Sequence, residues 1–159
     1  YLLRLKKDGV QGLFLNGQAE GSVERMLKDL STLRWKPQIY ASYLPSSPAL
    51  LDKAKEELEG TEFSDLPKVD DVVTPENRGI YQEYKRKFGE PRSMEASFVT
   101  VFEGFRALHQ ALESKNAKEY LLSKKFHGIF GEYSFDTKGE IKGLHFVIKK
   151  IRNGQVVTP

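Results

Sequence analysis

The sequence has 159 residues, of which 39% are apolar and 30% charged, and a formal net charge of +3. This length suits one ordinary globular domain, and the composition excludes a disordered chain. No stretch approaches the ~18 apolar residues of a membrane span, and the absence of cysteine excludes disulfide and thiolate chemistry. Because the chain starts at Tyr1, already inside an apolar-periodic segment, we expect a mature or truncated piece.

The basic residues are spread along the chain in short runs and alternate with acidic residues. Such runs are typical of solvated faces, whereas a nucleic-acid site needs basic residues clustered on one surface. The sequence therefore predicts no nucleic-acid partner. The runs are Lys6-Lys7, Lys85-Arg86-Lys87, Lys124-Lys125 and Lys149-Lys150.

A short apolar run at residues 13–15 predicts the first strand, which Asn16-Gly17 ends. Ser22 is a suitable N-cap for a helix that follows. Apolar residues with helical spacing extend this helix: Val23, Met26, Leu27, Leu30 and Leu33.

The same alternation of strand and helix continues over the next thirty residues. Residues 38–42 predict a second strand, and the Ser-Ser-Pro stretch at 46–48 predicts a helix with either serine as its N-cap. Gly60 is expected to end this helix, and residues 61–66 predict a third strand. Strands and helices that alternate with short links predict an α/β fold, a Rossmann-like parallel sheet flanked by helices.

After Pro67 two helices are predicted. Thr74-Pro75-Glu76 is a good start for the first, and Gly89 with Pro91 ends it. The second and longest carries a stripe of large apolar residues, which predicts close packing as part of a core. Its members are Met94, Phe98, Val101, Phe102, Phe105, Leu108 and Leu112.

The C-terminal part is different, because glycines interrupt a series of strand-like segments. A turn is predicted at residues 136–139, and Asn153-Gly154 is a strong hairpin signal. An α/β part, then helices, then strands is an unusual order for one closed domain. We therefore expect the middle and the two ends to belong to different packing units.

The first junction between strand and helix, residues 16–22, resembles a phosphate-binding loop only superficially. Its glycines give G-x-x-x-G and the Lys of a P-loop is missing, while Glu20 would repel a phosphate. Gly17 is expected to supply a turn with positive φ. The side-chain amides of Asn16 and Gln18, with the backbone N–H groups after them, are candidates to bind a polar ligand.

The second junction offers Ser42 and Tyr43, and an exposed Tyr in such a loop can line a pocket and donate from its hydroxyl. Since parallel strands end at one edge of their sheet, we expect both junctions at the same edge.

Catalysis has little support in the sequence. His109, His127 and His145 have no metal-ligand spacing, and no G-x-S-x-G motif is present. We predict a protein that is not an enzyme and has no catalytic residue, metal or cofactor. A nucleotide-dependent α/β enzyme that uses the first junction is the alternative from another class.

The order of elements resembles the second half of the type I periplasmic binding proteins, the branched-chain amino acid or amide receptors of ABC transporters. The resemblance covers essentially the whole chain. Its most specific part is the pattern F-x-G-x-x-G-x-x-x-F-D-x-x-G from Phe126, followed by a strand that ends in Ile-Arg-Asn-Gly.

This resemblance implies a fragment of a two-lobed fold. Residues 1–66 would form strand-helix repeats of the C-terminal lobe, residues 67–143 a segment of the N-terminal lobe with two to three helices and a strand, and residues 144–159 the final strands of the C-terminal lobe. Because much of both lobes would be absent, we expect the piece to come from a longer protein or to associate with itself or another chain.

The resemblance also implies a function, the capture of a small polar, amino-acid-like or aromatic solute in a cleft between the lobes for a membrane permease. It assigns the solute to Asn16, Gly17, Gln18, Ser42, Tyr43, Glu95 and Ser97. Amino-acid receptors carry an acid where Ser42-Tyr43 stands, so an amide or aromatic compound is as consistent as an amino acid. Location would be periplasmic or extracellular, membrane-associated for a lipoprotein. A ligand-sensing regulatory domain of the same fold is the alternative.

Overall fold

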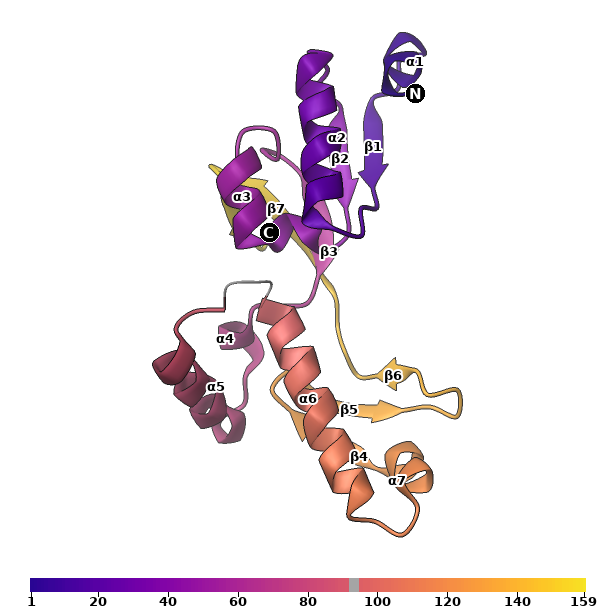
Figure 1. Cartoon of the computed structure of the whole chain (residues 1–159), viewed down its shortest axis with the longest axis vertical. Helices are drawn as coiled ribbons and strands as arrows, with labels where there is room; N and C mark the ends of the chain where they lie inside the picture. The colour runs from indigo at the N-terminus through magenta and orange to yellow at the C-terminus, as the bar shows by residue number, and fades with distance from the viewer. Residues whose placement is uncertain (92–94) are drawn as a thin grey trace. The chain divides into compact units, whose positions relative to one another are not determined.

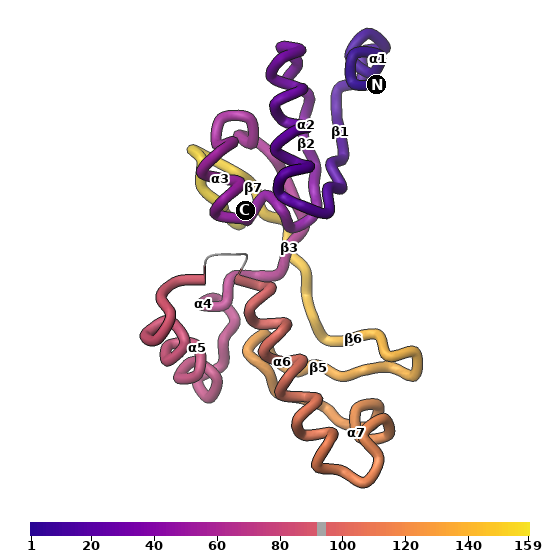
Figure 2. Tube along the Cα trace, in the orientation of Figure 1, coloured from indigo at the N-terminus to yellow at the C-terminus, as the bar shows by residue number. Residues whose placement is uncertain are grey.

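The computed structural model describes residues 1–91 and 95–159. The chain divides into two compact units, which we describe separately. Unit 1 comprises Tyr1–Asp65 and Phe146–Pro159, and unit 2 comprises Leu66–His145. Figure 2 shows the chain leaving unit 1 once and returning to it once, so the two ends of the sequence fold together. The assignment of these units to the two lobes of a binding protein stays a prediction.

Unit 1 contains a five-stranded sheet in the order β1-β2-β3-β7-β8 (Figure 1). The first three strands run parallel, as the alternation of strands and helices predicts, and β7 and β8 are antiparallel to their neighbours. The predicted hairpin at Asn153-Gly154 joins the last two strands. The strands are β1 (Gly12–Leu15), β2 (Gln38–Ala41), β3 (Glu62–Asp65), β7 (Val147–Arg152) and β8 (Gln155–Val157).

The two faces of this sheet differ in exposure. One face carries the core residues of the unit, which include Leu15, Ile39 and Phe63. Along β1 and β2 the alternate residues Phe14 and Tyr40 lie on the other face, where they are paired and exposed. The helices of unit 1 that carry buried residues are therefore on one side of the sheet, and an aromatic strip of the other side is open.

Helix α2 (Glu20–Thr32) begins earlier than predicted, because its N-cap is Ala19 rather than Ser22. The Ala19 carbonyl accepts from the N–H groups of Ser22 and Val23, so Ser22 already lies inside the first turn. The predicted apolar stripe is right, since Val23, Leu27 and Leu30 are buried. Helix α1 (Leu2–Lys7) precedes β1 and contains no buried residue.

Helix α3 (Pro48–Ala54) confirms the Ser-Ser-Pro start, with Ser47 as the N-cap and Pro48 at the first position. It ends at Ala54, before the expected stop at Gly60, and the chain continues in turns to Gly60, where φ is +81°. Leu58 is fully buried although it lies outside the helix. The short 3-10 helix η1 (Leu44–Ser46) lies between β2 and α3.

The described residues of unit 2 form four helices, α4 (Val69–Val72), α5 (Pro75–Phe88), α6 (Glu95–Leu112) and α7 (Ala117–Ser123), and a small sheet. As the sequence predicts, α5 begins after Thr74, whose side chain makes no capping hydrogen bond, and Gly89 ends it with φ at +78°. The large apolar residues of α5 differ in burial. Tyr81 is fully buried, but Ile80 and Phe88 are exposed.

Helix α6 contradicts the prediction that its large apolar stripe packs into a core. The buried positions are Val99, Glu103, Ala107 and Ala111, on one side of the helix. Phe98 and Phe102 pack partly against the core of unit 2, whereas the rest of the stripe is exposed and Met94 lies outside the described residues. The exposed members, which we call the open face of α6, are Val101, Phe105, Leu108 and Leu112.

The small sheet of unit 2 is antiparallel, in the order β4-β5-β6, and its strands are β4 (Lys125–Gly128), β5 (Gly131–Phe135) and β6 (Ile141–Lys142). Phe126 and Tyr133 stack on each other with ring centroids 5.2 Å apart and, with Ala107 of α6, form an apolar cluster. In the described part of the chain, no helix has the length and apolar character that crossing a membrane requires.

Candidate functional site

The first two predicted junctions lie side by side at one edge of the unit 1 sheet. β1 and β2 run parallel with Leu15 opposite Ala41, so Asn16 and Ser42 are the next residues along adjacent strands. Asn16 is exposed and Ser42 is partly exposed. We use the name carboxyl edge for these residues, 16–18 and 42–43, which follow the carboxyl ends of β1 and β2. It brings together five of the seven residues singled out for the ligand.

Gly17 has a different role from the one that the sequence suggests. Its φ is not among the positive values, so a left-handed turn does not explain it. A Cβ added at Gly17 would lie 2.4 Å from the Cγ2 atom of Val23, which is much closer than real Cβ contacts. The glycine therefore lets the loop pack directly on α2, and this leaves Asn16 and Gln18 exposed on either side of a buried residue.

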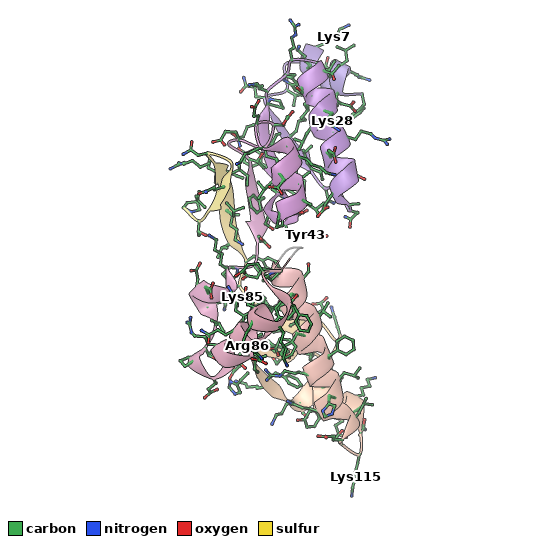
Figure 3. All side chains as sticks on the ribbon, turned by 60° about the vertical axis from the view of Figure 1, so that its left-hand side comes forward. Lys7, Lys28, Tyr43, Lys85, Arg86 and Lys115 are labelled. Carbon is green, nitrogen blue, oxygen red and sulfur yellow. The ribbon has the colours of Figure 1, made fainter. Side chains whose placement is uncertain are left out.

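Tyr43 lies in the loop after β2 and is 41% exposed, as its place at a strand end predicts. Figure 3 shows its side chain at the surface of unit 1. Its carbonyl accepts from the Ser46 N–H at 3.1 Å and from the Ser46 hydroxyl at 2.7 Å, which holds the backbone of η1 in place. The Tyr43 ring is thus presented on an ordered loop.

Glu20 is not a free carboxylate in the first junction. The hydroxyl of Ser47, which is completely buried, donates a short hydrogen bond to Glu20. The Ser47 Oγ also accepts from the Leu50 N–H at 3.5 Å. A negative charge in the first turn of α2 interacts favourably with the helix dipole. Glu20 therefore connects the N-termini of α2 and α3, which stabilises the loops on either side of the carboxyl edge.

Lys149 and Asp65 form a buried ion pair that the sequence did not predict. Lys149, which belongs to a run interpreted as solvated, is only 5% exposed, and its ammonium lies 2.9 Å from the Asp65 carboxylate. Since β7 places alternate residues on the covered face, Lys149 is inside and Lys150 is partly exposed. Residues 147–152, Val-Ile-Lys-Lys-Ile-Arg, do not alternate between apolar and polar types, so the sequence carried no clear signal for this pair. Asp65 ends β3, which runs parallel to β2, so the pair adds fixed charges beneath this edge of the sheet.

The two remaining candidates, Glu95 and Ser97, belong to unit 2. Glu95 accepts from the backbone N–H of Val69 at 3.0 Å and from the hydroxyl of Tyr81. Burial, followed by this hydrogen bond, raises the pKa of Tyr81 well above its ordinary value. Glu95 therefore ties α6 to α4 and α5. Ser97 is partly exposed, and its carbonyl accepts from the Thr100 hydroxyl at 3.2 Å.

Within residues 1–91 and 95–159, no group of three or more His, Asp or Glu side chains could hold a metal ion. The three histidines are spread over unit 2, and His127 lies 4.0 Å from Glu132 at the surface. The chemistry available at the carboxyl edge is therefore hydrogen bonding by amides and hydroxyls, with an aromatic ring beside them.

No family model and no curated protein matches this sequence. Solved structures do match it. A leucine binding protein from Thermotoga maritima is similar with a TM-score of 0.82 and 19% identity over 99% of this chain and 46% of that one. A branched-chain amino acid transporter substrate binding protein from Streptococcus pneumoniae, in complex with isoleucine, matches with a TM-score of 0.71 and 16% identity over 94% and 45% of the two chains.

A solute binding protein of an ABC transporter from R. palustris, in complex with benzoate, matches with a TM-score of 0.71 and 11% identity, over 99% of this chain and 44% of that one. This chain thus spans less than half the length of these three proteins. The neighbours are consistently type I periplasmic binding proteins, and none of those named here is an enzyme. At these identities the likeness establishes the fold.

Proposed function

We propose that this chain, which has the fold of the type I periplasmic binding proteins, is part of a protein that captures a small organic solute without changing it chemically. The observation that carries the proposal is the pairing of the two strand ends. It gathers Asn16, Gln18, Ser42 and Tyr43 at one edge of a parallel sheet, where α/β proteins commonly bind ligands.

The polar groups of this edge favour a particular class of solute. Asn16, Gln18, Ser42 and Tyr43 are uncharged, and Glu20 already accepts from Ser47. Neutral hydrogen-bonding groups beside an aromatic ring suit a ligand with amide, hydroxyl or carbonyl atoms and an apolar part. The names of two neighbours mention leucine and benzoate, each of which combines carboxylate oxygens with an apolar part.

A ligand panel tests the proposal. Purified protein is titrated by calorimetry with leucine, isoleucine, benzoate and benzamide, and separately with ATP and NAD. We expect saturable binding of at least one organic solute and none of the nucleotides. Binding of a nucleotide alone would contradict the proposal and favour the alternative of a nucleotide-dependent enzyme.

Variants locate the site within the protein. We expect the double substitution Asn16→Ala and Gln18→Ala to weaken solute binding roughly thirtyfold, since each removes hydrogen bonds worth about 1 kcal/mol. Both side chains are exposed, so the melting temperature should stay nearly unchanged. Gln11→Ala is the matched control, because Gln11 is also exposed and precedes the same strand at its other end.

Glu95 and Ser97 remain part of the proposed site as predictions. Ser97→Ala is the informative variant, with a severalfold loss of solute affinity expected for one lost hydrogen bond. Glu95 is a poor probe, because its removal would leave the buried N–H of Val69 and the hydroxyl of Tyr81 without their acceptor. An unchanged affinity in Ser97→Ala would remove this residue from the site.

We further propose that the protein passes its solute to a membrane permease and works in the periplasm or outside the cell. The neighbours named above include transporter solute-binding proteins, which supports this partner. Fractionation of the source cells, together with uptake of the bound solute in a strain lacking the protein, tests both parts. Normal uptake in that strain would favour the alternative, a ligand-sensing regulator of the same fold.

A further inference from the structure

We propose that unit 1 has a second binding site, at the opposite edge of its sheet, for a small organic cation with an apolar part. The site is a pocket of about 360 Å³, a volume within the usual range for ligand pockets. All its lining residues belong to unit 1. They come from the end of α2, the link to β2 and the link between α3 and β3, so the pocket is separate from the carboxyl edge.

The floor of this pocket is apolar and contains an aromatic ring. Leu27, Leu30 and Ile39 belong to the core of unit 1, and Trp35, which is partly buried, and Pro37 complete the apolar lining. The chain turns sharply after α2, because Arg34 has φ at +48° and the Trp35 N–H donates to the Leu30 carbonyl at 3.0 Å. This turn holds Trp35 against the end of the helix. An indole face attracts cations through its quadrupole.

The rim of the pocket is acidic. Glu56, Glu57 and Glu59 line it together with Lys36, and the charges of Arg152 and Lys150 also act on Glu59. The carboxylate of Glu59 is held in place by the N–H groups of Asn153 and Gly154, each at 3.0 Å. These backbone hydrogen bonds lower the pKa of Glu59, so it is charged at neutral pH.

The end of α2 borders the pocket, and its last turn carries no basic residue. A helix C-terminus favours a positive charge, and the Lys6 ammonium, which donates to the Leu33 carbonyl at 2.6 Å, supplies one there. The negative character of the pocket therefore comes from its glutamates. An apolar floor with an indole ring and an acidic rim therefore suits an ammonium or guanidinium group on an aliphatic or aromatic body, and disfavours an anion of the same shape.

Three probes of matched shape test this site: 4-phenylbutylammonium, 4-phenylbutanol and 4-phenylbutyrate. Trp35 is the only tryptophan of the sequence, so its fluorescence reports on the pocket. We expect saturable quenching by the ammonium, at least fivefold weaker binding of the alcohol and no binding of the carboxylate. Equal affinity for the ammonium and the alcohol, or no saturation by the ammonium, would overturn the proposal.

Paired charge variants assign the binding to the rim. We expect Glu56→Gln with Glu57→Gln to weaken ammonium binding about fivefold, since each partly solvated charge pair is worth a fraction of a kcal/mol. Glu76→Gln with Glu113→Gln is the matched control, because it removes two exposed charges from unit 2. Equal weakening in both pairs would indicate attraction to net charge alone and would refute the assigned site. Trp35→Phe should abolish the fluorescence signal while calorimetry still detects the ammonium.

Discussion

Helices α2 and α6 both carry a regular apolar stripe, but the stripe of α2 is buried and that of α6 is largely exposed. In α2 the stripe of Val23, Leu27 and Leu30 is buried. The other side of α2 is charged, with Lys28 bonded to Glu24 at 2.7 Å. In α6 the buried side carries small residues and a glutamate, and the large residues of the open face point into solvent.

The difference shows that periodicity identifies a helix but does not identify its packed side. A helix that is apolar on both sides is typical of a helix buried on both sides. Exposed apolar surface of this kind marks an interaction surface in many proteins. Four substitutions test this comparison of α2 with α6. They are given in the order of their expected effect on stability, from the largest to the smallest.

We expect the largest loss of stability when a buried leucine of α2 is replaced by alanine. Leu27 is 1% exposed, and Leu27→Ala should lower the free energy of unfolding by about 2–5 kcal/mol through lost burial and a cavity. Leu108→Ala on the open face of α6, where Leu108 is 46% exposed, should cost less than about 1 kcal/mol. Urea denaturation measures both. Equal losses would mean that the open face is covered in the protein in solution.

A substitution of Glu103 tests the buried side of α6. Its carboxylate accepts from the Ile129 N–H at 2.9 Å and lies 3.3 Å from the hydroxyl of Tyr133 and 3.4 Å from Arg106. Glu103→Ala would leave a buried N–H without its acceptor, and we expect a loss of about 2–4 kcal/mol. Glu113→Ala, at an exposed position just after α6, is the control. Similar stability of both variants in thermal denaturation would contradict the role assigned to Glu103.

Gly17 tests the contact of α2 with the loop before it. Gly17→Ala places a methyl group against Val23, and overpacking of this kind costs about 1–3 kcal/mol. Gly21→Ala is the matched control, because an added Cβ there meets nothing within 4 Å. We expect a lower melting temperature only in Gly17→Ala. An unchanged value would mean that the loop moves away from α2 at little cost.

The smallest effect on stability is expected at the open face itself. Phe105 is 70% exposed, so Phe105→Ser should change the free energy of unfolding by less than about 0.5 kcal/mol. The same substitution should reduce self-association of the chain in sedimentation velocity, because it removes exposed apolar area. A wild-type chain that is already a monodisperse monomer would contradict the expected association.

The candidate site could be predicted in part from the sequence. Two strand ends in a parallel sheet must share an edge, so the proximity of Asn16 and Ser42 follows from the alternation of strands and helices. The partners of Glu20, Glu95 and Lys149 did not follow from it, because each lies far away along the chain or on another element. Ser47 is 27 residues from Glu20, and Asp65 is 84 residues from Lys149.

The sequence by itself determined the α/β class, the order of most elements and the positions of several helix ends, because caps, glycines and periodicity act over a few residues. Only the tertiary structure decided which side of α6 is buried, why Gly17 is a glycine and which lysine of the pair at 149–150 is inside. Those choices depend on contacts between distant segments, where the free energy of burial and ion pairing outweighs local preference.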